Sequence, residues 1–307
     1  MMSEFKRGLN DELIKLLAKE AEKVGWWRDV LADSKFLIGI RDEYLQVYWH
    51  GQSLFTAKAV NGQLKVTTHE KYLLDPKLES QVELSDGHFK VAHLVEKGFT
   101  KKYGGTATLQ NMKTVADYFS GIEKPGCHEI ATRNDTFLDC EIAFPGFTSS
   151  EDGIENEKGR VDIACVESSG DDVRLVFWEV KHYSNKELRS DLRNNKLAPV
   201  CRQIKKYRNY ISQHRKLVLD SYTRVAHNLV ALQAMRANRE LSPLIIDVGT
   251  GKRCLVLDED PKIGLMIFGF DEAQRDHARW TKHLVRLRDN ISPSPVVAVG
   301  NAKDVKL

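Results

Sequence analysis

The chain has 307 residues, of which 42% are hydrophobic and 29% charged, with a formal net charge of +3. This length allows one large domain or two medium ones with a buried core, and the composition excludes an intrinsically disordered chain. No apolar stretch approaches the roughly 18 residues needed to span a membrane, and the charged N-terminus does not resemble a signal peptide. The five cysteines show no Cys-x-x-Cys spacing, which favours reduced thiols over disulfides or a zinc site. We therefore expect a cytoplasmic protein that does not insert into a membrane.

The first part of the chain, residues 1–110, predicts a helix followed by a small β-rich module. Apolar residues recur at helical spacing within residues 3–24. Asn61-Gly62 is typical of a two-residue hairpin turn between antiparallel strands. We expect a four-stranded antiparallel meander before a boundary near residue 110. Its strands are predicted at Phe36–Ile40, Tyr44–Trp49, Leu54–Val60 and Leu64–Thr68.

The second part, residues 111–307, predicts an α/β domain with a mixed central sheet. Gly249-Thr250-Gly251-Lys252 lacks the first glycine and the final Ser or Thr of a phosphate-binding loop, so we predict a turn between strands there. The predicted strands are Thr136–Phe144, Arg160–Glu167, Arg174–Lys181, Leu244–Val248, Cys254–Leu257, Gly264–Phe270 and Val296–Val299. The predicted helices are Met112–Ile122, Leu197–Gln213, Leu217–Arg239 and Glu272–Asp289.

Charge is distributed unevenly along this second part. From Lys181 to Arg224, 12 Lys or Arg residues stand against three Asp or Glu, whereas residues 151–172 hold eight acids and two bases. Each block alone is equally consistent with a solvated surface. Side by side, the two blocks are what a phosphate-binding surface next to a cation site would need.

The tripeptide pattern Glu-x-Lys occurs twice, and its context separates the two copies. Glu4-Phe5-Lys6 lies among polar residues, whereas Glu179-Val180-Lys181 ends the apolar run 175–178, which predicts a buried strand. Period-two alternation places Glu179 and Lys181 on the same side of that strand. Asp162 lies on the preceding predicted strand and would approach Glu179 if the two strands form an antiparallel hairpin.

This arrangement suits phosphodiester chemistry. Two carboxylates with open positions bind a hard cation such as Mg²⁺, which also grips a phosphate oxygen and lowers the pKa of a bound water. An adjacent ammonium can orient that water and stabilise the developing negative charge. A surface Glu-Lys pair beside an unrelated Asp is the alternative explanation.

Asp162, the strand end Glu179-Val180-Lys181 and the helical pattern Gln203-Ile204-Lys205-Lys206-Tyr207 together resemble the PD-(D/E)xK superfamily of restriction-endonuclease-like nucleases. The resemblance covers roughly residues 120–300 and implies a mixed central sheet flanked by helices. It implies that Asp162 and Glu179 hold Mg²⁺ or Mn²⁺, that Lys181 assists the attacking water, and that Gln203 positions this water or a phosphate. The Pro that names the motif is replaced by Val161, a position at which many members vary.

The family often adds an acid on the helix before the first strand. Glu123 and Glu129 lie in this region, although Pro125 and Gly126 are expected to disturb the helix between them. We favour Glu123 as the further metal ligand. Glu141, on the first strand, is a third alternative.

Nucleic-acid contacts are predicted along the basic segment that follows the Glu-x-Lys strand. Arg160 could contact a phosphate or remain a solvated strand-end residue. His182 is expected to be a bystander, because alternation points it away from Lys181. The residues predicted to bind nucleic acid are Arg160, Arg202, Lys205, Lys206 and Tyr207.

The sequence thus predicts a metal-dependent nuclease, and the resemblance favours DNA over RNA and suggests a role in restriction, repair or antiviral defence. A non-catalytic nucleic-acid-binding protein with a nuclease fold, an RNA-cleaving enzyme and a partner subunit of a larger complex are the alternatives. A homodimer or a protein partner is compatible with each of them.

Overall fold

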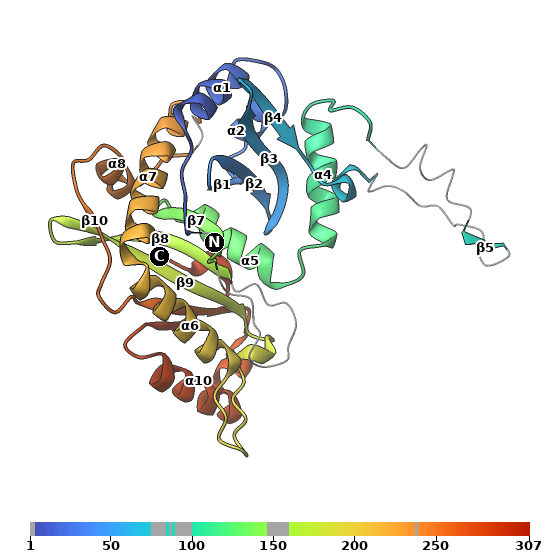
Figure 1. Ribbon diagram of the computed structural model, residues 1–307. Helices are drawn as coiled ribbons and strands as arrows, with labels where there is room; N and C mark the ends of the chain where they lie inside the picture. Colours follow the sequence, from blue (N-terminus) through green and yellow to red (C-terminus); the bar gives the residue numbers. More distant parts are fainter. Residues whose placement is uncertain (1–3, 75–83, 86–87, 90–99, 146–159, 237–238) are drawn as a thin grey trace.

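The computed structural model describes residues 4–74, 84–85, 88–89, 100–145, 160–236 and 239–307. Within these residues the protein is a mixed α/β fold with two larger sheets flanked by helices, and a short hairpin of β5 (Leu84–Ser85) and β6 (His88–Phe89) (Figure 1). No helix in these ranges is long and apolar enough to cross a membrane.

The N-terminal sheet is the predicted antiparallel meander, with strand order β1-β2-β3-β4. Asn61 and Gly62 both adopt positive φ values, 51° and 76°, which is the conformation that a tight hairpin requires. The meander prediction is therefore confirmed. The strands are β1 (Leu37–Ile40), β2 (Tyr44–Trp49), β3 (Gln52–Val60) and β4 (Gln63–Thr67).

The helix predicted over residues 3–24 is shorter in the structure. Helix α1 (Asp11–Ala21) begins after Asn10, whose side chain accepts the Leu13 N–H, and a second helix α2 (Trp26–Ala32) follows. Before α1 the chain is extended, and Gly8, with φ 141°, donates its N–H to the Arg41 carbonyl. Because this φ is incompatible with a helix, apolar spacing alone overestimated the helical length.

The central sheet has the strand order β12-β11-β9-β8-β7, and β10 also pairs with β9. The strands β7, β8 and β9 are antiparallel, whereas β10 and β11 run parallel to β9 and β12 runs parallel to β11. The predicted mixed sheet is therefore confirmed. Its strands are β7 (Phe137–Ala143), β8 (Arg160–Ser169), β9 (Asp172–His182), β10 (Leu255–Val256), β11 (Ile263–Phe268) and β12 (Val296–Ala298).

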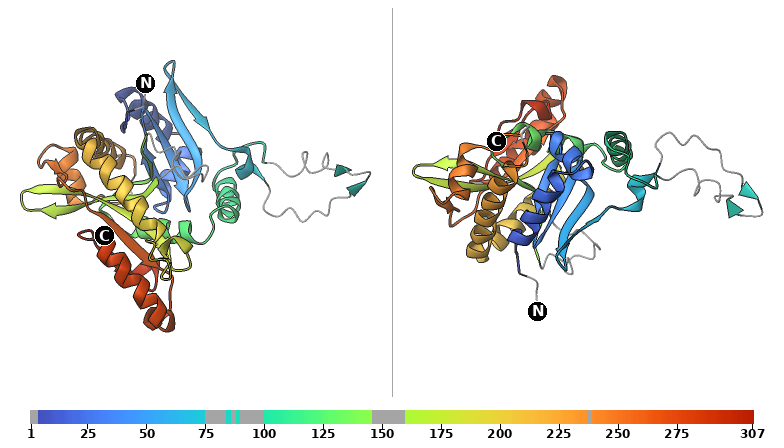
Figure 2. Two further views of the ribbon diagram at one scale, coloured as in Figure 1. Left: turned by 60° about the horizontal axis from the view of Figure 1, so that its bottom comes forward. Right: turned by 90° about the horizontal axis from the view of Figure 1, so that it is seen from above.

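Helices cover this sheet and join it to the N-terminal sheet. Helix α1 contacts α7, and α10 lies at the side of the central sheet away from β1–β4 (Figures 1 and 2). The predicted boundary at residue 110 falls inside α4. The helices are α4 (Thr106–Tyr118), α5 (Glu123–Arg133), α6 (Pro199–Gln213), α7 (Arg215–Gln233), α8 (Pro243–Gly249), α9 (Glu272–Asp276) and α10 (Ala278–Ile291). The short 3₁₀ turns are η1 (Glu70–Leu73), η2 (Lys186–Leu188) and η3 (Ala302–Asp304).

Three predictions for the chain after α7 differ from the structure. The segment Leu244–Val248 is part of helix α8 and not a strand, because Ser242 caps the helix and Pro243 occupies its first turn. Gly249-Thr250-Gly251-Lys252 therefore ends a helix and does not connect two strands. The helix predicted over Glu272–Asp289 is divided at His277, which has an extended backbone and caps α10.

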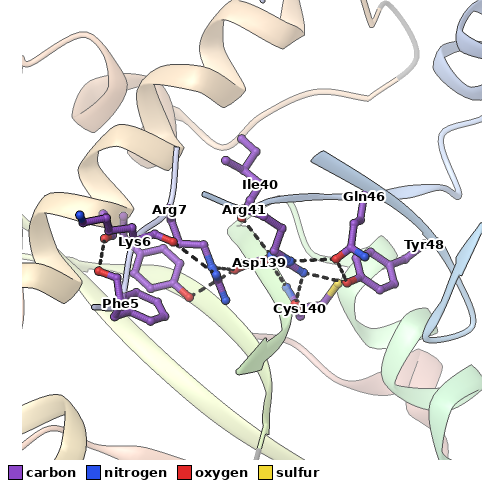
Figure 3. Close-up of polar contacts among 11 residues, drawn as sticks. Phe5, Lys6, Arg7, Ile40, Arg41, Gln46, Tyr48, Asp139 and Cys140 are labelled. Atoms are coloured by element: carbon purple, nitrogen blue, oxygen red, sulfur yellow. Dashed lines mark hydrogen bonds and ion pairs between the residues drawn. The ribbon is translucent and has the colours of Figure 1, made fainter. Parts of the chain in front are cut away.

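The two sheets share one buried apolar cluster, and a polar network lies where β1–β2 meets β7. Asp139 on β7 is fully buried, and its Oδ1 lies 2.6 Å from Arg41 Nη1 (Figure 3). Its Oδ2 lies 3.4 Å from Arg7 Nε and accepts a 3.4 Å hydrogen bond from the Tyr222 hydroxyl. Arg41 also donates to the Tyr48 hydroxyl at 3.1 Å. We call these five residues the Arg41–Asp139 network.

Candidate active site

Asp162 and Glu179 lie side by side on the antiparallel strands β8 and β9. In this ladder Ile163 faces Trp178, so the next step of the register places Asp162 opposite Glu179. Asp162 Oδ2 accepts a 2.7 Å hydrogen bond from the Val180 N–H, which fixes the carboxylate against β9. The predicted hairpin between the two strands is confirmed.

Lys181 lies two residues further along β9 and is 7% exposed. Its ammonium is 2.9 Å from Glu179 Oε1 and 2.7 Å from Glu187 Oε2, and a longer contact of 3.9 Å reaches Glu123 Oε1. One ammonium thus faces three carboxylates that come from β9, the turn η2 and helix α5. We call Glu123, Asp162, Glu179, Lys181 and Glu187 the acid cluster.

Of the three alternative acids, Glu123 is the one that the fold brings to Lys181. It is the first residue of α5, and its Oε2 accepts hydrogen bonds from the His182 N–H at 2.9 Å and from Asn185 Nδ2 at 2.8 Å. Glu129 instead pairs with Arg133 on the exposed side of α5, at 3.1 Å. Glu141 forms ion pairs with Lys124 and Arg160, at 2.9 and 3.1 Å.

The expectation that Pro125 and Gly126 would disturb this helix is wrong. Pro125 lies in the first turn of α5, where no intrahelical N–H is required. Gly126 lets the helix approach the sheet, since a Cβ atom there would come within 2.2 Å of the Phe268 ring on β11. Both residues therefore help to bring the start of α5, with Glu123, to the end of β9.

Burial and mutual repulsion shift the pKa values of the two strand carboxyls. Burial raises the pKa of Asp162 to about 7, and the negative charges of Glu141 and Glu123 also raise it. The Lys181 charge and the hydrogen bond from the Val180 N–H lower it but do not outweigh burial. Burial, followed by the charge of Asp162, raises the pKa of Glu179 well above its usual range. Burial opposes the charged form of Lys181, but the surrounding carboxylates, Glu179 first, raise its pKa above the usual value.

One oxygen of Glu179 is left without a partner. Glu179 is 1% exposed, and its Oε2 is buried without a hydrogen bond to any residue that the structure describes. A buried carboxylate oxygen without a donor is costly, and a hard cation would compensate it. However, the described residues contain no group of three or more His, Cys, Asp or Glu side chains arranged to hold a metal ion. A cation here would therefore rely on Asp162 and Glu179 together with water and substrate oxygens.

Gln203 and Tyr207, one turn apart on α6, connect the helix to the start of β8. Gln203 Nε2 donates to the Tyr207 hydroxyl at 2.7 Å, and this hydroxyl donates to the Arg160 carbonyl at 2.9 Å. Tyr207 is fully buried, so it does not offer the nucleic-acid contact that was predicted for it. The pair instead fixes β8 two residues before Asp162.

The predicted basic residues fall into two groups. Arg202, Lys205 and Lys206 are exposed on the outer side of α6 and form no ion pair with any residue in the described ranges. Arg160 is tied to Glu141 instead. Helix α6 thus presents these three cations to solvent on the helix that also carries Gln203.

Glu187 and Asn185 also belong to the site, although they were not predicted from the sequence. Both lie in the connection between β9 and α6, where Asn185 caps η2 by accepting the Glu187 N–H at 2.9 Å. An Asn followed two residues later by Glu, directly after a strand, was the available signal. His182 contacts Ser184 through Nδ1 at 2.8 Å and packs its ring against Phe268.

In comparisons with known proteins, no family model, no curated protein and no solved structure matches the chain.

Proposed function

We propose that this protein is a metal-dependent nuclease with a restriction-endonuclease-like domain, which hydrolyses phosphodiester bonds in DNA. The proposal rests on one observation above all. Two carboxyl groups, the half-buried Asp162 and the buried Glu179, lie opposite each other at the ends of adjacent strands, and one oxygen of Glu179 has no partner in the described part of the chain. This is an arrangement that Mg²⁺ or Mn²⁺ would stabilise.

In this proposal, Asp162 and Glu179 hold the cation, which when bound would polarise the phosphodiester and lower the pKa of a water. Glu123 and Glu187 keep the Lys181 ammonium at the strand end, where it can orient a water and stabilise negative charge on the phosphate. Gln203 acts through Tyr207 as a positioning residue for β8. Because Glu179 and Lys181 are two residues apart on β9, both side chains point to the same face. Glu179 is the proposed metal ligand there, and Lys181 is the cationic group.

The surface around the site supports a nucleic-acid substrate. The exposed Arg202, Lys205 and Lys206 offer a row of cations to a phosphate backbone. The preference for DNA over RNA rests on the resemblance of the Asp162, Glu179-x-Lys181 and Gln203 pattern to restriction-endonuclease-like nucleases.

The direct test is cleavage of labelled DNA and RNA with Mg²⁺, with Mn²⁺ and with a chelator. Glu179→Gln and Asp162→Asn should abolish cleavage, because each removes a charged oxygen ligand while preserving shape. Glu167→Gln is the matched control, since Glu167 is a carboxylate at the other end of β8 that pairs with Arg174 at 2.8 Å. Near-wild-type cleavage by either site variant would overturn the assignment.

A non-catalytic nucleic-acid-binding protein is the second candidate. The Lys181 ammonium already contacts Glu179 and Glu187 within 3 Å. These contacts favour this candidate, because they occupy the group that would otherwise orient a water. Under this alternative the wild type binds DNA or RNA but cleaves neither in Mg²⁺ or Mn²⁺, and Glu179→Gln changes nothing in binding.

A further inference from the structure

A pocket of about 520 Å³ opens between the connection after β9 and the helices α9 and α10. Tyr183 contributes from the end of β9, where its N–H donates to the Phe268 carbonyl at 2.7 Å. Arg189 follows from the same connection, and Arg279, Trp280 and His283 come from α10. The lining includes no member of the acid cluster, so this is a separate site beside the carboxyl ends of the parallel strands β9 and β11.

Arg189 is the central group of the pocket. Its guanidinium lies 4.7 Å from the Tyr183 ring centre and 4.5 Å from that of Trp280, and its Nη2 donates to the Tyr183 carbonyl at 2.7 Å. Its Nη1 is buried and has no hydrogen-bond partner among the described residues, and the same holds for Trp280 Nε1. Stacking thus holds the arginine in place, and two buried donors beside the pocket have no partner among the described residues.

The pocket carries positive charge that the protein does not neutralise. Neither Arg189 nor Arg279 forms an ion pair within the described ranges, and the repulsion between them contributes, after burial, to lowering the pKa of Arg189. The lining contains one carboxylate, Asp271, which is already used as the cap of α9 by accepting the Gln274 N–H at 2.7 Å. The described lining therefore holds two arginines and one carboxylate, which leaves an excess of positive charge.

Two further features supply donors to the same space. His283 Nδ1 accepts the Ser190 N–H at 3.2 Å, which leaves the proton of the neutral ring on Nε2 as a donor. His277 lines the pocket and caps α10, a helix of 14 residues whose N-terminal end carries partial positive charge. All of these groups favour an anion.

We propose that this pocket binds a phosphate monoester. Two unpaired arginines and a helix N-terminus match a dianion better than the single charge of an internal phosphodiester or a carboxylate. The volume exceeds what a phosphate group fills, so part of the molecule that carries the phosphate also enters the pocket. The carrier is a free nucleotide or the phosphorylated end of a nucleic-acid strand, which share this chemistry.

Equilibrium binding in the presence of a chelator tests the proposal independently of cleavage. The probes are inorganic phosphate, nucleoside 5′-monophosphates, the matching nucleosides, and short oligonucleotides with either a phosphate or a hydroxyl at the end. The phosphorylated member of each pair should bind more tightly, by about tenfold to a hundredfold, because the hydroxyl partner cannot form the charge-assisted hydrogen bonds. If the phosphate raises affinity only among the nucleotides, the ligand is a free nucleotide. If it also raises the affinity of oligonucleotides, the ligand is the phosphorylated end of a strand.

Arg279→Gln should abolish this preference, and because Arg279 is exposed the variant should fold normally. Arg275→Gln is the matched control: Arg275 lies on the neighbouring helix α9, is paired with Asp276 and does not line the pocket. Trp280→Phe keeps an aromatic ring next to Arg189 but replaces the indole by a smaller phenyl group without the buried N–H, and should weaken phosphate binding less than Arg279→Gln does. Equal binding of phosphorylated and hydroxyl partners by the wild type, or an equal loss in Arg275→Gln, would overturn the proposal. The preference should persist in Glu179→Gln, so failure of the nuclease proposal leaves this test unaffected.

Discussion

Two buried charged clusters, the Arg41–Asp139 network and the acid cluster, are opposite in sign and differ in how completely the protein satisfies them. In the Arg41–Asp139 network, two guanidinium groups converge on one carboxylate, which also accepts from the Cys140 N–H and the Tyr222 hydroxyl. In the acid cluster, one ammonium serves several carboxylates, and Glu179 Oε2 has no partner within the described residues. The first cluster is satisfied by the protein alone, whereas the second lacks positive charge.

This contrast is what we expect between a cluster with a structural role and the site of the proposed function. A buried ion pair whose hydrogen bonds are complete fixes two elements relative to each other, here β1–β2 against β7. A buried cluster that repels itself lowers stability and persists where function needs it. The difference predicts that the same kind of substitution will have opposite effects in the two regions.

The largest expected effect concerns Lys181. If Lys181 supports the attacking water, Lys181→Ala should lower the single-turnover cleavage rate by about two to four orders of magnitude. Metal and substrate should still bind, because the carboxylates and helix α6 remain. Single-turnover kinetics together with metal titrations measure both quantities.

Lys181→Arg decides between the two roles that the acid cluster allows for this residue. A planar guanidinium with a pKa above about 12 cannot replace a compact ammonium at a reacting water, so activity should not return. As a mere counter-charge for Glu179 and Glu187, arginine should serve nearly as well. Full activity in Lys181→Arg would therefore remove the catalytic role of the lysine and leave only the carboxylate site.

The next effect compares the two aspartates directly. Asp139→Asn breaks a complete buried network and should lower the free energy of unfolding by about 3–5 kcal/mol. Asp162→Asn keeps an acceptor for the Val180 N–H and removes a carboxyl whose pKa is raised to about 7. A carboxyl whose pKa is higher in the folded chain than in the unfolded chain lowers the free energy of unfolding as the pH rises towards the folded pKa. At pH 8 the asparagine variant lacks this penalty and should be more stable than the wild type.

Urea unfolding of both variants at pH 8 and pH 5 checks this pair. The gain in Asp162→Asn should shrink at pH 5, where the wild-type carboxyl is already protonated. If the free energy of unfolding falls by several kcal/mol in both variants at pH 8, then Asp162 stabilises the fold as Asp139 does, and the contrast between the two clusters is wrong.

A smaller effect tests the contact of α5 with the N-terminal sheet. His128 accepts the His50 N–H on Nδ1 at 3.2 Å and donates from Nε2 to the Lys35 carbonyl at 2.8 Å, and burial lowers its pKa to about 3. Between pH 6.5 and about 3, His128 is therefore protonated in the unfolded chain and neutral in the folded chain. Stability should fall by up to about 1.4 kcal/mol per pH unit between pH 6.5 and 3.

Comparing unfolding free energies at pH 6.5, 5.5 and 4.5 isolates this contribution. His128→Gln should flatten the acid slope, and His227→Gln, at an exposed histidine on α7, should leave it unchanged. Equal slopes in wild type and His128→Gln would show that this histidine does not govern the acid sensitivity.

The smallest expected effect concerns the surface of α6. Reversing the charges of Lys205 and Lys206 should weaken nucleic-acid binding and reduce the log–log salt slope by about 0.9 for each phosphate that the helix no longer neutralises. The same double reversal at Lys15 and Lys19, exposed on α1, is the control with an equal change in net charge. If both double variants reduce the slope equally, net charge and not α6 governs binding.

Local periodicity was enough to predict the part of the site that lies on regular strands. Alternation placed Glu179 and Lys181 together, and the hairpin brought Asp162 to them, because adjacent antiparallel strands leave little freedom. Glu187 and Asn185 escaped prediction since an irregular connection has no period. The Leu244–Val248 run was misread as a strand, although Ser242-Pro243 carried a helix start signal.

The Arg41–Asp139 network could not have been predicted in the same way. Arg41 and Asp139 are 98 positions apart, and nothing in the local sequence of either one indicates the other. Pairing of this kind depends on how β1–β2 docks on β7, which is decided by the whole buried apolar cluster.

The connection between β9 and α6 carries groups of both proposed sites. Glu187, in contact with Lys181, and Arg189, in the pocket, are only two residues apart. If an anion bound at Arg189 shifts this connection, the position of Glu187 and the charge around Lys181 change with it. Thermodynamic reciprocity then requires that the factor by which pocket occupancy changes cation affinity equals the factor by which the cation changes pocket affinity. A titration of either ligand in the presence of the other would reveal this short connection as the coupling element of the molecule.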